Sequence, residues 1–528
     1  MTEQADVVII GSGVAGALCA WRLATRGLRI LVLEAGPRVT RSDIIAGVLA
    51  TPKRDLSAGY PRAAWAPRPD WSAGKDKYMV QSGPQVIQLE YLRLVGGTTW
   101  HWNSGIDRLL PADFRMKSTF GVGIDWPISY EEIEPYYVEA ERELGVAGRE
   151  DRGSPRSSPF PMPPLPLTYA ENTIAAKLRD IGISVNHRTS ARNSIDYDGR
   201  PRCDGFGTCT PICPTGAQYS AIVHVEKAEH AGARVLADYR VDRIDVETSG
   251  RVTGVTYGRP DGSTGRAEGR IVILAANAIE SPRILLASAN ETVSRGIANT
   301  SDLVGRNLMD HPTHHGHFET ADPIYAGRGP MFTGSIDAFR TGADRHNRAA
   351  YMMLFDSRIG LFQLTAELLA SGPQPPQLDT VLRERAMRRF DMHVETEQLP
   401  DPTNRVTIDW TDRDSAGQPR IHLHYAIGNY ERLGLANGIE TLQRIGRQLN
   451  AKRLTIDGIA AAHHPTGTLR MGNDPKTSVV DKDGRCHDHP NLFITGGAAF
   501  PTCGSCGPTI TIAALALRTA DAIGRQLG

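Results

Sequence analysis

The stretch Val7-Val8-Ile9-Ile10-Gly11-Ser12-Gly13-Val14-Ala15-Gly16 lies near the N-terminus and decides the fold class. Its four β-branched residues predict a strand buried on both faces, and the G-x-G-x-x-G pattern predicts a tight turn into a helix. A helical stretch over 17–25, closed by Gly27, and a second apolar run over 30–33 complete a βαβ unit. The sequence therefore predicts an α/β protein with a dinucleotide-binding domain.

The glycines and one acidic residue of this unit predict what it binds. Gly11, Gly13 and Gly16 allow a pyrophosphate to approach the N-terminus of the helix, where N–H groups without partners favour anions. Glu34 ends the second strand, 18 residues after Gly16, and is placed to accept hydrogen bonds from an adenosine ribose. The motif alone does not separate FAD from NAD.

Length and composition limit the class of protein. The 528 residues include 59 Lys and Arg and 59 Asp and Glu, so we expect neither a nucleic-acid partner nor a polybasic membrane anchor. With 40% hydrophobic and 22% charged residues, the chain has the composition of a soluble globular protein. We expect no cleavable signal before the first strand, and no membrane helix because no apolar run approaches about 18 residues.

The remaining sequence predicts how the chain is divided. Two proline- and arginine-rich segments, 50–80 and 149–167, are expected to be irregular and to lie on the surface. Residues 313–454 alternate strand-like runs with helical ones, such as 431–449, and are interpreted as a substrate domain inserted into the nucleotide domain. The apolar stretch 508–517 predicts a C-terminal helix with proline in its first turn.

Three of the seven cysteines are clustered in a glycine- and proline-rich loop. Cys203, Cys209 and Cys213 form a C-x5-C-x3-C-P pattern. Thiolates at such spacing can converge on one iron–sulfur cluster, and three ligands favour [3Fe–4S] because a [4Fe–4S] cluster normally has four. Two alternatives remain open at this stage. One is a structural zinc site completed by His224, and the other is a disulfide with one spare thiol.

Several further segments carry a family resemblance. They are Gly96–Asn103, expected after a helical stretch, Asn277–Ser288, expected after a strand over 271–274, Gly305–Pro312, His464–Gly472 and Pro490–Ile494. With the βαβ unit, and in this order, they resemble the glucose–methanol–choline (GMC) oxidoreductase family of FAD enzymes. The resemblance implies a Rossmann-like FAD-binding domain with an interleaved substrate domain built on an antiparallel sheet.

The resemblance also implies domain boundaries. The FAD-binding domain is expected over 1–50, 85–125, 200–312 and 455–528, with the iron–sulfur loop at 203–214. The substrate domain and its connecting segments are expected over 51–84, 126–199 and 313–454.

A closer resemblance within the family rests on Val95–Trp102, Asp125–Tyr130 and Cys203–Tyr219. These segments look like the catalytic subunit of bacterial membrane-associated FAD glucose dehydrogenases, whose relatives oxidise sorbitol, fructose, gluconate or 2-ketogluconate. The resemblance implies a [3Fe–4S] cluster on the three clustered cysteines, a small exported partner subunit and a multihaem cytochrome c. It also implies a place on the periplasmic face of the inner membrane, reached with the signal-bearing partner and held through partners only; the alternative is a cytoplasmic enzyme.

The catalytic residues follow from the chemistry of alcohol oxidation. A hydride must reach flavin N5, and a base must take the hydroxyl proton. A histidine, with an ordinary pKa of about 6.5, suits the role of this base. His464 holds the catalytic position of the family's H-x-x-G-T motif and is the expected base; the alternative is a core histidine. The family usually has Asn or His where Gly507 stands, so we expect His463 to assist, while a water, another side chain or a different substrate remains open.

The resemblance further implies which residues contact FAD. These are Gly11, Gly13, Ala15, Gly16, Glu34, Ala35, Gly97, Thr98, His101, Trp102, Asn103, Val241, Ala276, Gly497, Ala498, Pro508 and Thr509. Backbone N–H groups near Pro508 are expected to stabilise the charge of the reduced flavin. His101 either bonds covalently to the flavin 8α carbon, as in some family members, or packs on the ring. The histidine run over 311–317 is expected to be ordinary pocket and surface histidines, with a metal site as the alternative.

Together these features predict an FAD-dependent dehydrogenase of a sugar, sugar acid or polyol, with a glucose-type aldose first among them. Electrons are expected to leave singly through the cluster to a cytochrome c. The alternatives are a GMC sugar oxidase, a glycoside 3-dehydrogenase that uses another acceptor, and a flavin-bearing assembly or redox-sensing protein without turnover.

Overall fold

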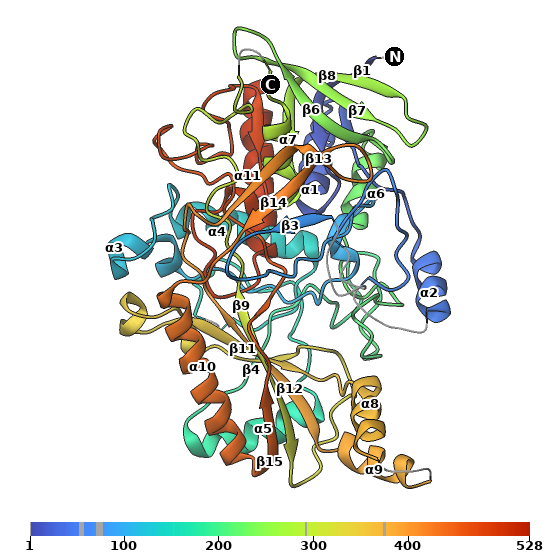
Figure 1. Cartoon of the computed structure of the whole chain (residues 1–528), viewed down its shortest axis with the longest axis vertical. Helices are drawn as coiled ribbons and strands as arrows, with labels where there is room; N and C mark the ends of the chain where they lie inside the picture. The colour runs from blue at the N-terminus through green and yellow to red at the C-terminus, as the bar shows by residue number, and fades with distance from the viewer. Residues whose placement is uncertain (1, 52–56, 70–77, 151–152, 291–292, 373–375) are drawn as a thin grey trace.

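The computed structural model describes residues 2–51, 57–69, 78–150, 153–290, 293–372 and 376–528. Within these residues the chain forms three β-sheets. The first lies toward one end of the long axis, the second toward the other end, and the small third sheet between them (Figure 1).

The first sheet carries the N-terminal βαβ unit. Its strands are β1 (Thr2–Ile10), β2 (Ile30–Leu33), β5 (Arg234–Leu236), β6 (Arg240–Val246), β7 (Val252–Gly258), β8 (Thr264–Leu274) and β17 (Leu492–Ile494). The order is β5-β2-β1-β8-β7-β6, and β17 also pairs with β8. Val8 of β1 lies opposite Leu31 and Val272 in parallel ladders on both sides, which explains its continuous apolar run.

Helices close the faces of this sheet. Helix α1 (Val14–Ala24) packs on α6 (Ile222–His230) and on the C-terminal α11 (Thr509–Leu527), which also packs on α4 (Tyr130–Leu144). The predicted first helix is confirmed, although it begins at Val14 directly after the turn. The predicted C-terminal helix is also confirmed, with Pro508 at its N-cap instead of in its first turn.

The second sheet is antiparallel in every pairing. Its strands are β4 (Asn186–His187), β9 (Pro312–Thr320), β10 (Gly334–Ile336), β11 (Tyr351–Asp356), β12 (Arg389–Thr396), β15 (Ala451–Ile456) and β16 (Ala460–Ala461). The order is β15-β9-β12-β11-β10-β4, and β16 also pairs with β9. Helix α10 (Asn429–Gln448), predicted over 431–449, covers one face, and α5 (Tyr169–Leu178) packs on α10.

The third sheet joins β13 (Arg405–Arg413), β14 (Pro419–His424) and β3 (Met79–Gln81). Helix α7 (Asn277–Ala287), which follows β8, contacts β13. The other α-helices are α2 (Arg41–Ala50), α3 (Met116–Phe120), α8 (Leu361–Ser371) and α9 (Gln377–Ala386). The 3-10 helices are η1 (Gly97–Trp100), η2 (Pro111–Phe114), η3 (Arg179–Ile181), η4 (Ala338–Arg340), η5 (Ala343–His346) and η6 (Gly497–Ala499).

One predicted element is wrong. No helix directly precedes Gly96, and residues 82–94 form neither helix nor strand. Ile87, Leu89 and Tyr91 are buried in alternation, which is the period of an extended chain, and Pro84 also disfavours a helix. Of the segment predicted to be irregular over 50–80, residues 52–56 and 70–77 lie outside the described residues. In the described part of the chain, no helix is long and apolar enough to cross a bilayer.

Candidate active site

Two cavities meet beside the glycine-rich turn that joins β1 to α1. The first is lined by residues of β1, β2, α7 and the segment before η1, and it includes Gly13, Thr98 and Asn277. The second shares these three residues and continues to the N-terminus of α11 and to the second sheet. A long dinucleotide can therefore lie across both cavities without a break.

The glycine-rich turn fits the pyrophosphate of FAD. A Cβ atom on Gly11 would lie 2.7 Å from the carbonyl oxygen of Ala275, and one on Gly16 would lie 2.0 Å from that of Gly11. Both positions therefore exclude a side chain. At Gly13 nothing lies within 4 Å of the Cβ position, so the N-terminus of α1 faces open space of the kind that a phosphate occupies.

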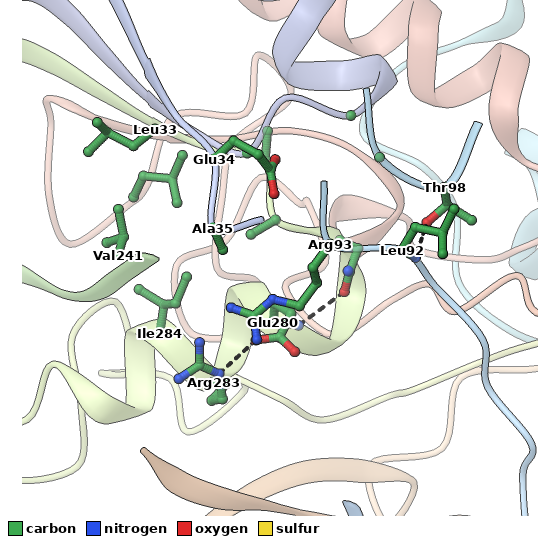
Figure 2. Close-up of a pocket in the computed structure, with 17 residues that line it drawn as sticks. Leu33, Glu34, Ala35, Leu92, Arg93, Thr98, Val241, Glu280, Arg283 and Ile284 are labelled. Carbon is green, nitrogen blue, oxygen red and sulfur yellow. Dashed lines mark hydrogen bonds and ion pairs between the residues drawn. The ribbon is translucent and has the colours of Figure 1, made fainter. Parts of the chain in front are cut away.

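The first cavity fits an adenosine. Figure 2 shows Glu34 and Ala35 at the end of β2, with Leu33, Val241 and Ile284 forming an apolar side. Glu34 accepts hydrogen bonds from the N–H of Ser12 at 3.0 Å and of Gly36 at 3.1 Å, one at each carboxylate oxygen. Burial raises the pKa of Glu34.

A buried ion pair lies at the other side of this cavity. The Arg283 Nε atom lies 2.7 Å from Glu280 Oε2, as the dashed line in Figure 2 marks. The hydroxyls of Tyr78 and Tyr91 donate to Glu280 Oε1 at 2.7 and 2.6 Å. Burial alone would raise the pKa of Glu280, but Arg283 and Arg93 lower it to about 2. The carboxylate is therefore charged and fully engaged.

The cavities contain most of the residues expected to contact FAD. The first is lined by Gly11, Gly13, Glu34, Ala35, Gly97, Thr98, Val241 and Ala276. The second is lined by Gly13, Ala15, Thr98, His101, Trp102, Asn103, Gly497, Pro508 and Thr509, together with His463 and His464. Gly16 and Ala498 line neither. Gly16 packs on the backbone of Gly11, and the buried Ala498 accepts the N–H of Leu469 at 2.7 Å.

A pair of histidines forms the chemical centre of the second cavity. His464 Nδ1 lies 3.0 Å from His311 Nδ1, and His311 Nε2 lies 3.0 Å from the carbonyl oxygen of Gly504. A carbonyl oxygen only accepts, so the neutral His311 carries its hydrogen on Nε2 and accepts at Nδ1. His464 therefore carries its hydrogen on Nδ1, which leaves Nε2 with a free lone pair.

The backbone holds this pair in place through Asp310. One carboxylate oxygen of Asp310 accepts the N–H of His464 at 2.7 Å and that of His311 at 2.8 Å. Within the described residues, Asp310, His311 and His464 are the group whose ligand atoms lie within 4.8 Å of one another. The contacts between these residues already account for that arrangement. His311 lies in the stretch Gly305–Pro312 singled out in the sequence, within Asp310-His311-Pro312, and this is the signal that could have found it.

Electrostatics favour a neutral His464. Its removal from bulk water and the neighbouring His311, His463 and Arg188 hold the pKa of His464 well below its usual range. A neutral imidazole with a free lone pair on Nε2 is suited to accept a proton near neutral pH.

His463 and Gly507 are both neighbours of this base. His463 has a left-handed backbone, with φ of 63°, and its Nδ1 accepts the N–H of Glu90 at 3.2 Å. Its Nε2 is therefore the donor when the ring is neutral. Gly507 lies beside His464, and the N-terminus of α11 follows it, with Pro508 and Thr509 facing the cavity.

His101 also lines the second cavity. Its ring packs edge-on against Tyr60, with ring centroids 5.7 Å apart. Asn103, two residues later, lines the same cavity. Both possibilities for His101, the covalent link and the packing contact, require that His101 lies beside the flavin.

The clustered cysteines lie next to the second cavity. Cys209 and Cys213 are buried and Cys203 is half-buried, and Thr210 between them lines the cavity. Gln218 Nε2 donates to the carbonyl oxygens of Trp102, at 2.6 Å, and Cys209, at 3.3 Å. One side chain therefore joins the cysteine loop to the segment expected at the flavin, a contact that sequence reasoning missed.

The structure bears on the two alternatives for these cysteines. His224 is fully buried, with Nδ1 2.9 Å from the hydroxyl of Tyr219 and Nε2 3.1 Å from Glu143. Both ring nitrogens are engaged, so His224 does not complete a zinc site. All seven cysteines are free thiols, so the alternative with a disulfide is not found.

Arginines surround the cysteine loop. Arg192 is 1% exposed and, within the described residues, has no carboxylate in ion-pair distance; its Nη atoms donate to backbone oxygens of Met331 and Asn103, both at 3.0 Å. Burial raises the pKa of the Cys203 thiol, and the Arg192 charge opposes that rise. Arg41 donates to the carbonyl oxygen of Cys213 at 2.5 Å.

A buried guanidinium without a counter-ion costs several kcal/mol, so an anion beside Arg192 would be stabilised. Three thiols with arginines beside them that have no carboxylate partner in the described residues are chemically compatible, as a donor set, with an anionic iron–sulfur group.

The histidine run over 311–317 divides among several partners. His314 Nδ1 lies 2.8 Å from the backbone oxygen of Asp457, and His317 lies between the carboxylates of Asp391 and Asp457 at 2.9 and 3.0 Å. His315 stacks on His393 with ring centroids 4.1 Å apart. The run does not converge on one point.

Comparison with known proteins adds three findings. The chain matches the GMC oxidoreductase family over residues 176–313 and 400–516, and an FAD dependent oxidoreductase family over 6–108. It is 38% identical to the fructose dehydrogenase large subunit of Gluconobacter japonicus, over 99% of this chain and 98% of that protein. It is 31% identical to the 2-methyl-1,2-propanediol dehydrogenase of Mycolicibacterium austroafricanum, over 99% and 96%.

The fold is found among solved structures. Pyridoxine 4-oxidase from Mesorbium loti superposes with a TM-score of 0.66 at 19% identity, covering 98% of this chain and 99% of that one. At this identity the likeness concerns the fold, and it agrees with the architecture predicted from the sequence.

Proposed function

The chain belongs to the GMC oxidoreductase family of FAD enzymes acting on CH–OH donors, and on that premise we propose that it is a dehydrogenase of a sugar, sugar acid or polyol. The observation that carries the chemistry is the hydrogen-bonded pair of His464 and His311. It leaves a lone pair on His464 Nε2 in the cavity where the substrate hydroxyl must lie.

FAD, when bound, supplies the hydride acceptor for the substrate carbon. His464 takes the hydroxyl proton at Nε2 as the carbon is oxidised. His311 keeps the ring in the right tautomer by accepting the Nδ1 hydrogen. The N–H groups in the first turn of α11 have no intrahelical acceptors and favour negative charge beside Pro508. His463 presents its Nε2 hydrogen to the same cavity, and we propose that it assists in holding the substrate oxygen.

We further propose that electrons leave through a [3Fe–4S] cluster on Cys203, Cys209 and Cys213. A flavin takes up an electron pair and a haem takes one electron at a time, and a cluster between them would relay the electrons singly over the distance. The unpaired Arg192 and the Gln218 contact between the cysteine loop and Trp102 support this route. Similarity to a protein named a large subunit supports a multisubunit assembly.

The proposed assembly contains a small exported partner and a cytochrome c on the periplasmic face of the inner membrane. The alternative location is the cytoplasm. The division into FAD-binding and substrate domains expected from the sequence remains part of this proposal. Fructose joins the glucose-type aldose among the first substrates to test, since the similar dehydrogenase is named for it.

The test begins with protein purified without air. We expect flavin, about three irons per chain, acid-labile sulfide and an EPR signal in the oxidised state. We also expect sugars or polyols to bleach the flavin anaerobically. Flavin with no iron would contradict the electron route, and oxygen uptake during turnover would then favour a sugar oxidase. Failure of every sugar and polyol to bleach the flavin would contradict the dehydrogenase itself.

A further inference from the structure

A buried carboxylate without a partner lines the second cavity. Glu395 on β12 is 4% exposed, and within the described residues its side chain makes no hydrogen bond or ion pair. A buried acceptor left without donors is unfavourable, and more so when it is charged. A side chain kept in this state in the cavity that also holds His464 is explained if the donors arrive with the substrate.

The second sheet orients Glu395 toward the cavity. Glu395 lies opposite Thr313 in the β12–β9 ladder, and His393 lies opposite His315. All four side chains line the second cavity. The residues that alternate with these face away from the cavity. Val394 is one of them and packs on α10, where a Cβ atom on Gly438 would lie 2.4 Å from its side chain. The cavity-facing side of the strand pair therefore forms a polar wall of the cavity that also holds His464.

Neighbouring contacts place Glu395 near the catalytic end of this wall. Glu395 interacts electrostatically with Cys506, which directly precedes Gly507 beside His464. At the other end, Arg358 interacts with Cys209 in the cysteine loop.

The neighbouring polar groups of the wall contact Asp356 or one another. Arg358 donates from Nε to Asp356 at 2.9 Å, and His393 Nε2 lies 3.4 Å from the same carboxylate. His315 stacks on His393, and burial, with the neighbouring His393 and His317, lowers the pKa of His315 to about 3, so that it is neutral. Glu395 is thus the charged group of this wall that, within the described residues, has no hydrogen-bond or ion-pair partner.

We propose that Glu395 determines substrate specificity by accepting hydrogen bonds from hydroxyls adjacent to the one oxidised at His464. This inference rests on the proposed dehydrogenase function and narrows its substrate class. A carboxylate has acceptors only, so it binds vicinal hydroxyls and repels a second carboxylate at the same place. The preferred substrate is a neutral polyol or sugar whose hydroxyls flank the reacting carbon, while a simple alcohol lacks the second donor.

The experiment measures kcat and KM for an active hexose or hexitol and for each of its monodeoxy analogues, with the complete holoenzyme. In the native enzyme, we expect removal of a hydroxyl beside the reacting carbon to lower kcat/KM about 100-fold or more, because a site built to bind a hydroxyl rejects the analogue without it. In Glu395→Gln we expect KM to rise about tenfold with kcat nearly unchanged, and the penalty for that deoxy analogue to shrink to a few-fold.

Two further variants complete the design. Asp391→Asn removes a carboxylate from the same strand outside the cavity, and it should leave both KM and the deoxy penalty unchanged. Glu395→Asp keeps the charge but shortens the reach, so it should keep part of the penalty, and it replaces Glu395→Gln if that protein does not fold.

The outcomes separate this inference from the function beneath it. An unchanged deoxy penalty in Glu395→Gln would overturn the role of Glu395 while the dehydrogenase stands. Equal kcat/KM values for a polyol and a simple alcohol in the native enzyme would do the same. If no sugar or polyol bleaches the flavin, the proposed function fails and this inference fails with it.

Discussion

A Cβ atom on Gly507 would lie 3.8 Å from Nε2 of His464 and 3.6 Å from its Cε1. These are ordinary contact distances, and the backbone of Gly507 does not need a positive φ, so an added methyl group fits the fold. The backbone therefore does not require glycine at this position. The space beside the base, which a side chain would fill, is left open for substrate.

Gly507→Ala should consequently impair turnover without loss of the cofactor. We expect kcat/KM for the best sugar to fall about tenfold or more, because a displacement of about 1 Å at the reacting carbon is enough for such an effect. Flavin absorbance of the purified variant gives the cofactor content. Wild-type kinetics in this variant would mean that the substrate does not approach His464 from the side of Gly507.

The hydrogen bond between His464 and His311 leads to a second prediction. His311→Phe removes the acceptor for the Nδ1 hydrogen, so the base loses its fixed tautomer, and we expect kcat to fall about 10- to 100-fold. His311→Asn offers an amide oxygen in a similar place and should restore part of the rate. Steady-state kinetics of the two variants provide the measurement, and equal losses in both would count against a role in fixing the tautomer.

The pH dependence of kcat/KM follows from the lowered pKa of His464. The base is active when neutral, so the rate should stay level across neutral pH and decline only in acid, below the ordinary histidine pKa of about 6.5. The free energy of unfolding changes with pH in the same direction as the rate. The unfolded chain binds a proton at His464 below about pH 6.5 and the folded chain does not, so this group lowers the free energy of unfolding as pH falls.

Kinetics over pH 4–9 (~half-unit steps) and urea unfolding at the same pH values measure the two effects. His464→Gln is the control, because it should lose at least about 100-fold in kcat and flatten the pH profile. A rate that declines already at pH values above about 7 would show that His464 does not have the lowered pKa.

Arg192 leads to a fourth prediction, which rests on the proposed cluster. Its charge is buried beside Cys203 without a carboxylate, so it stabilises the more negative, reduced state of an iron–sulfur group. Arg192→Gln should lower the midpoint potential by roughly 60 mV, which for one electron is about 1.4 kcal/mol. EPR-monitored redox titration measures the shift.

Arg470→Gln serves as the matched control for this charge. Arg470 is likewise an arginine with no ion pair in the described residues, but its Nε donates to the backbone oxygen of Thr477, far along the chain from the cysteine loop. The potential should not change in that variant. Equal potentials in the native protein and in Arg192→Gln would remove Arg192 from the electrostatics of the cluster.

The sequence predicted the elements whose signals are local. The βαβ unit was found because its glycines, its apolar strands and Glu34 all lie within 30 residues or so of one another. His464 was proposed as the base from a short motif, and the structure places it at the second cavity. The helix predicted before Gly96 was wrong because a buried extended chain can be as apolar as a helix. The alternation of the buried Ile87, Leu89 and Tyr91 was the better signal.

The partners across the site were not predictable in this way. Glu395 enters the cavity because β9 and β12 pair in one register, although about 80 residues separate them, and a shift of one residue would turn it away. The Gln218 contact to Trp102 and the contact of His311 with Gly504 likewise join distant segments. No local pattern in a single sequence encodes such contacts.

The chain builds its first sheet from both ends, and this matters during translation. Strand β8 pairs with β17 and the buried face of α1 packs on α11, and both partners are translated long after the βαβ unit. At about 5–20 residues per second, the N-terminal βαβ unit spends on the order of half a minute or more on the ribosome without its partners. Its apolar strands are exposed to chaperones for that time, so a truncation that removes only the final helix should leave the nascent nucleotide domain open to aggregation and proteolysis.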